Sequence, residues 1–98
     1  MSTFLVTLVS GASWDDAVGR RDQSGWTEHA AFMDALVADR TVVLGGPIGD
    51  GERVALVVEA ADEDAVRRAL AADPWLVDPV LAIAAIEPWT IWLDGRAR

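Results

Sequence analysis

The side chain best suited to acid–base chemistry in this sequence is its single histidine, His29. Histidine is the residue type that exchanges a proton near neutral pH without any perturbation. His29 falls on an apolar helical stripe, one turn before Met33, and a lone histidine on such a stripe is more often a core residue than a catalytic one. Position alone therefore leaves both roles open and favours the structural one.

A second candidate is Asp73, which stands directly before Pro74 and Trp75. An aspartate before a proline often starts a short helix, because its carboxylate caps the first turn and proline fits the first helical position. The sequence alone favours this capping role over a catalytic one. Gly46 and Pro47 are weaker candidates, since this pair is more typical of a turn than of a loop that binds a ligand.

Composition excludes several other kinds of site. The chain has no cysteine, so thiolate chemistry, disulfides and cysteine-based metal sites are excluded. One histidine is too few for a usual zinc site, and we expect neither a metal nor a cofactor. The formal net charge is −8, and the basic residues are all arginines in pairs or alone. Because nucleic acids and anionic membranes need clustered cations, we expect neither as a partner.

The elements that must position these residues can be predicted from periodicity. Strands are expected at residues 3–9, 41–45, 53–59 and 80–87, and helices at residues 26–38 and 62–72. On the first helix Val37 shares the apolar stripe of His29, and Asp62 is expected to cap the second helix. Residues 10–25 form a long loop with a helical turn near 14–18, and Gly46-Pro47 with Gly49–Gly51 predict a wide hairpin. The order predicts one α+β domain over residues 1–98, a ferredoxin-like βαββαβ fold with a four-stranded antiparallel sheet.

Both ends of the chain carry apolar residues. The first eleven residues lack a basic region and are too few to span a bilayer, so we expect a strand and a cytoplasmic protein. At the other end, Trp89 and Trp92 lie in an apolar tail, and residues 94–98 are expected to fray.

The strands are apolar on both faces, which predicts a homodimer through the open face of the sheet. The alternative cover for this face is the tail itself.

Four segments together resemble the YCII-related family. They are His29–Met33 with Leu36 and Val37, Leu44–Pro47, Ala71–Trp75, and Ile86–Trp89. The resemblance spans about residues 3–90 and implies a dimeric α+β barrel related to muconolactone isomerases, with a His–Asp pair in a pocket. Members of the family commonly have arginine three residues before the histidine. Trp26 takes that place here, which implies a drier pocket with less affinity for anions.

With this resemblance, a functional pair becomes the favoured interpretation. His29 would be the acid and base, and Asp73 would orient its ring. The expected pocket walls are Trp26, Gly46, Pro47 and Trp75. Isomerase or lyase chemistry on a small organic ligand fits such a site. The alternative is a non-catalytic dimeric module that binds a ligand or serves an accessory role, and an accessible pocket shared by the pair would distinguish the two.

Overall fold

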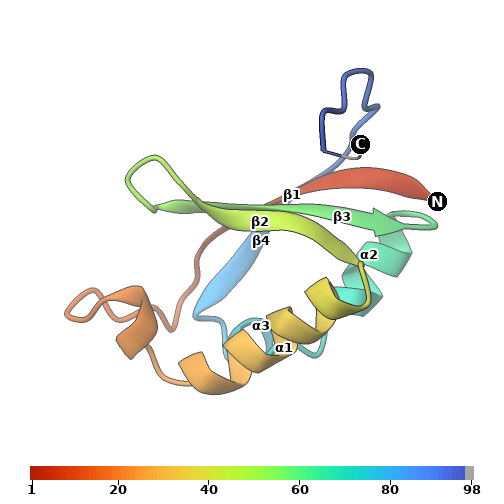
Figure 1. The fold of residues 1–98 in the computed structure, drawn as a ribbon. Coiled ribbons are helices and arrows are strands. Elements are labelled where there is room, and N and C mark those ends of the chain that lie inside the picture. The colour runs from red at the N-terminus through yellow and green to blue at the C-terminus, as the bar shows by residue number, and fades with distance from the viewer. Residues whose placement is uncertain (97–98) are drawn as a thin grey trace.

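The computed structural model describes residues 1–96, in which one antiparallel sheet carries all the helices on one of its faces (Figure 1). The elements are β1 (Ser2–Ser10), the 3-10 helix η1 (Arg20–Asp22), α1 (Trp26–Ala38), β2 (Val42–Ile48), β3 (Arg53–Ala60), α2 (Glu63–Leu70), α3 (Pro74–Val77) and β4 (Leu81–Pro88). The strand order is β2-β3-β1-β4, and the sheet is open. The predicted α+β class and βαββαβ order are confirmed.

The core lies between the sheet and the helices. In β1, buried Phe4, Val6 and Leu8 alternate with residues that are only half buried. Because successive side chains of a strand point to opposite faces, these three share the face that the helices cover. They pack in one cluster with Val66 of α2 and Trp75 of α3, so β1 joins the sheet to both helices near the candidate site.

The second strand is longer than expected, and the turn predicted at Gly46-Pro47 is wrong. Both residues continue β2, where Gly46 pairs with Ala55 and Pro47 with Val54. β2 is an edge strand. Proline is tolerated there because the backbone position that lacks an N–H group can face solvent and not a neighbouring strand. The chain turns later, through residues 49–52, where Gly49 and Gly51 have positive φ angles of 62° and 89°.

The loop between β1 and α1 is ordered by one side chain. Gln23 is 4% exposed. Its Oε1 accepts from the backbone N–H of Asp15 at 2.9 Å, while its Nε2 donates to the carbonyls of Asp15 and Val18 at 2.8 and 3.1 Å. The turn expected near 14–18 forms as a single hydrogen-bonded turn without a helix, with the N–H of Val18 donating to the carbonyl of Asp15 at 3.4 Å. The helical residues of the loop come later, as η1.

The helices differ from expectation in where α2 ends and in which side chains of α1 are buried. Asp62 caps α2 as predicted, accepting from the N–H of Ala65 at 2.8 Å. The helix ends at Leu70 rather than at residue 72, because the chain turns there toward Asp73. Val37, predicted on the inward stripe of α1, is 53% exposed. Among residues 1–96, no helix is long and apolar enough to cross a membrane.

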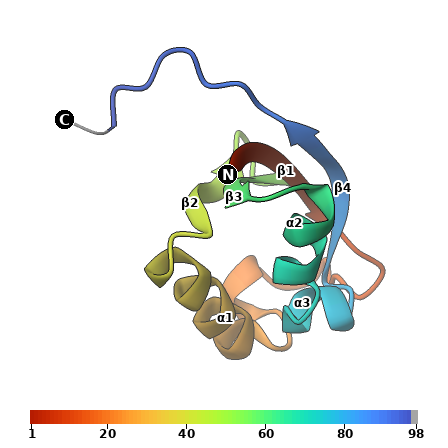
Figure 2. The same cartoon turned by 90° about the vertical axis from the view of Figure 1, so that its right-hand side faces the viewer.

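The tail after β4 lies on the side of the sheet opposite to the helices (Figure 2). It leaves β4 with the N–H of Trp89 donating to the carbonyl of Thr3 at 2.9 Å. A groove of about 200 Å³ separates it from Leu44 and Val57, while Trp92 remains exposed. The alternative cover for the open face is thus realised in part. Of the tail expected to fray, residues 97–98 lie outside the described residues.

Candidate functional site

The two candidate proton-transfer residues meet across the fold. His29 lies in the first turn of α1, which begins after Gly25, and Asp73 lies in the link between α2 and α3. The imidazole Nδ1 is 2.8 Å from Asp73 Oδ1 and 3.0 Å from Oδ2. The side chains are 12% and 2% exposed. His29 and Asp73 therefore form a buried hydrogen-bonded pair, as the resemblance implied.

Asp73 also caps α3, so the two roles weighed for it coexist. Its Oδ1 accepts from the backbone N–H of Trp75 at 2.9 Å, and Pro74 occupies the first helical position. This bond prevents free rotation of the carboxylate. Because an ionised carboxylate only accepts hydrogen bonds, Nδ1 of His29 carries the shared hydrogen. The start of α3 thereby determines which ring nitrogen is protonated.

Trp75 holds the imidazole ring in place. The rings of His29 and Trp75 are stacked, with centroids 4.0 Å apart and planes 8° from parallel. Trp75 is fully buried, and its Nε1 donates to the carbonyl of Ser24 at 2.7 Å. Gly25, which lies beside this indole, has a φ angle of 79°, a conformation that favours glycine. The stack and the carboxylate together restrict the ring of His29.

A cavity of about 280 Å³ opens beside His29, between α1 and one end of the sheet. The expected pocket residues Trp26, Gly46 and Pro47 line it together with His29. Trp75 and Asp73 do not belong to its lining; they lie behind the imidazole, one stacked on it and one bonded to Nδ1. Most of the other lining side chains are apolar: Leu8, Met33, Val37, Val42, Val54, Leu56 and Leu81.

No hydrogen bond joins Nε2 of His29 to residues 1–96, whereas Nδ1 is engaged by Asp73. With its hydrogen on Nδ1, a neutral imidazole has a lone pair on Nε2. The ring also forms part of the cavity wall. The arrangement therefore offers one basic nitrogen on a restrained ring beside an apolar cavity.

The sequence did not identify Arg20 as a residue of this cavity. Arg20 belongs to η1 and lines the cavity together with His29. Burial lowers the pKa of its guanidinium, which still remains protonated at neutral pH. The expectation of fewer anion-binding groups considered only the position of Trp26. A cation reaches the same cavity from the preceding loop, whose path no local spacing rule predicts.

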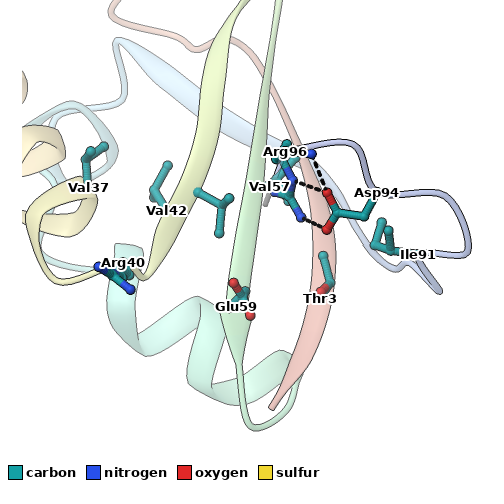
Figure 3. Close-up of a pocket in the computed structure, with 10 residues that line it drawn as sticks. Thr3, Val37, Arg40, Val42, Val57, Glu59, Ile91, Asp94 and Arg96 are labelled. Carbon is teal, nitrogen blue, oxygen red and sulfur yellow. Dashed lines mark hydrogen bonds and ion pairs between the residues drawn. The ribbon is translucent and has the colours of Figure 1, made fainter. Parts of the chain in front are cut away.

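Two other depressions lie away from the pair. One, of about 530 Å³, runs from the end of α1 across the sheet to the tail (Figure 3). Its charged residues include Asp94 and Arg96, which are bonded to each other at 2.7 Å. Arg96 holds the pKa of Asp94 well below its usual range. The second, of about 540 Å³, lies near Trp14 and Arg53.

A metal centre is not found in the part of the chain that the structure describes: no three His, Cys, Asp or Glu side chains are grouped to hold an ion. Comparison with protein-family models gives no match for the chain, and comparison with curated proteins gives none either. The likeness to YCII-related proteins therefore stays a prediction. What the structure contributes is the ferredoxin-like fold and the buried pair.

Proposed function

We propose that this protein is a small-molecule enzyme that transfers protons, with His29 as acid and base and Asp73 as its orienting partner. The observation that carries the proposal is the 2.8 Å contact between Nδ1 and Asp73, on a ring that also lines the apolar cavity. A carboxylate that orients an imidazole is a recurrent acid–base arrangement. Isomerisation or elimination on a small organic ligand suits it, because neither needs a protein nucleophile.

In this proposal each group has one task. Nε2 of His29 takes a proton from the ligand and returns it at another position or to a leaving group. Asp73 stabilises the imidazolium that forms in between, since its carboxylate stays bonded to Nδ1. Trp26, Gly46 and Pro47 form walls of the cavity that holds the ligand beside the ring. Trp75 supports the ring from behind.

We further propose that the chain is a divergent member of the YCII-related family. The meeting of His29 and Asp73, the antiparallel sheet and the place of Gly46 and Pro47 in the cavity wall support this assignment. The competing proposal is a binding or accessory module without catalysis. It is favoured by the structural work that the pair also performs, since Asp73 caps α3 and His29 stacks on Trp75.

Deuterium exchange tests the function. The protein is incubated in D₂O with small ketones, lactones and unsaturated acids that have acidic C–H bonds, and exchange is followed by ¹H NMR. We expect protein-dependent exchange in one class, because a restrained base beside an apolar cavity can remove such a proton. If no class exchanges above the buffer rate, the enzyme proposal is wrong and the binding module becomes the better interpretation.

Asp73→Asn is expected to weaken the preference for the Nδ1–H tautomer of His29. The wild-type carboxylate only accepts, whereas an asparagine amide can also donate toward the ring. Long-range ¹H–¹⁵N NMR reports the tautomer, and a single histidine makes the signals unambiguous. Glu28→Gln, an exposed change on the same helix, is the control. If Asp73→Asn retained the wild-type pattern, Asp73 would be a helix cap only.

We also propose a homodimer through the open face of the sheet. Leu44 is 53% exposed there, and Ile48, Trp89 and Trp92 are exposed as well; such a set of apolar side chains is typical of an interface. Light scattering at micromolar concentration should give twice the chain mass, and Leu44→Glu should give a monomer. Val77→Glu, on exposed Val77 of α3, should remain dimeric. A monomeric wild type would contradict this proposal.

A further inference from the structure

Among residues 1–96, Arg20 is the one cation in the wall of the cavity beside His29. Its Nη2 donates to the carbonyl of Gly51 at 2.6 Å, and its guanidinium lies 5.2 Å from the centre of the Trp14 ring. The other amino nitrogen, Nη1, is buried and has no hydrogen-bond partner among residues 1–96. No carboxylate in that range forms an ion pair with Arg20.

This arrangement is unusual for an arginine that serves only the fold. A buried N–H group without a partner costs free energy, and charged groups cost the most. Nevertheless the guanidinium is held in place, both by the loop that carries Arg20 and by the β2–β3 turn. Gln23 orders the loop through its bonds to Asp15 and Val18, and Gly51 fixes Arg20 to the β2–β3 turn. A cation held in this way, with a free donor, is prepared for a partner from outside the chain.

The surroundings limit what that partner can be. A carboxylate matches the planar donors of a guanidinium and can accept from Nη1. The rest of the cavity is mainly apolar, and its volume of about 280 Å³ lies at the small end of ligand pockets. Asp34 also lines the cavity, but it is exposed, so solvent screens its charge. The net charge of −8 disfavours ligands with a second negative charge.

We propose that the cavity binds a small organic acid by its carboxylate, with Arg20 as the anchor and the apolar part of the acid beside His29. This inference rests on the proposed function in that it names the substrate class of the same site. It makes Arg20 a specificity-determining residue that acts in binding, not in proton transfer. The acid replaces the missing partner of Nη1 and places its carbon skeleton next to Nε2.

NMR titration tests the inference, with the His29 ring signals and the tryptophan indole signals as reporters. The probes are butyrate and benzoate, each compared with its uncharged amide. We expect both acids to bind the wild type at least about tenfold more tightly than their amides, the factor typical of one charge-assisted hydrogen bond. Arg20→Gln should remove this difference. Arg68→Gln, an equal change of charge on the exposed face of α2, should preserve it.

Two further variants keep the outcomes distinct. Arg20→Lys retains the charge but not the planar donors, so we expect an intermediate preference for the acids; it also replaces Arg20→Gln if that variant unfolds. Asp73→Asn should still prefer acids, because Arg20 is unchanged, even if the proton-transfer proposal fails. The inference is overturned if neither acid binds by about 10 mM, a very weak affinity, or if acids and amides bind the wild type equally. It is also overturned if Arg20→Gln and Arg20→Lys retain the full preference.

Discussion

His29→Gln should lower the rate of deuterium exchange into a responsive ligand by about 10²–10⁴-fold, the usual contribution of a positioned acid–base group. Glutamine is polar and similar in length, so the cavity keeps its shape, but its amide cannot take up a proton near neutral pH. Nε2 is the nitrogen of His29 that is free of protein partners in the described residues. The variant therefore removes the base and leaves the walls of the cavity unchanged.

The rate is measured by ¹H NMR in D₂O under conditions in which the wild type is active. Glu28→Gln is the matched control, because Glu28 is exposed on the same helix and does not line the cavity. Near-ultraviolet circular dichroism of the tryptophans confirms that both variants fold. A His29→Gln protein that folds and exchanges at more than half the wild-type rate would show that the imidazole is not the base.

Of the variants considered, Trp75→Ala should lower the free energy of unfolding most, by about 3–5 kcal/mol. Losses of this size are typical when a large buried side chain is removed from a core. Trp75 is completely buried, stacks on His29 and donates to Ser24. A domain of this size is stabilised by roughly 5–15 kcal/mol in total. The variant should therefore lie close to the limit of folding, with a mobile histidine ring where it does fold.

Urea unfolding followed by far-ultraviolet circular dichroism measures this loss. Trp75→Phe retains an aromatic ring against His29 and loses the bond to Ser24, so we expect only about 1–2 kcal/mol. Val77→Ala trims an exposed side chain of α3, away from the proposed dimer interface, and should cost less than about 1 kcal/mol. If Trp75→Ala were no more destabilised than Val77→Ala, the stack would not support the fold.

The fold was largely predictable because local signals agreed with one another. Alternating residues in β1, a capping aspartate at Asp62 and the Asp73-Pro74 pair each depend on near neighbours. The errors fall where distant contacts decide the local structure. Pro47 sits in a strand because β2 is at the edge of the sheet, a property of the whole topology. Gln23 orders the loop by bonds to Asp15 and Val18, which no local pattern in residues 10–25 indicates.

The candidate site was predictable in part. Periodicity placed His29 on the inward side of its helix, and chemistry marked Asp73 as a cap, but only the resemblance joined the two. The stacking of Trp75 on His29 depends on how α3 packs against α1, which no spacing in the sequence reveals. Arg20 was missed for the same reason, since its place in the cavity depends on the path of the loop.

The loop that Gln23 orders has a consequence for how this protein could diversify. Arg20 reaches the cavity from a segment outside the sheet and the larger helices, whereas His29 and Asp73 come from elements that pack on the core. On the proposed function, substitutions in residues 11–25 change which molecules are selected, while His29 and Asp73 are inherited unchanged. Exchanging this segment between related proteins would be a direct route to new selectivity on an unchanged scaffold.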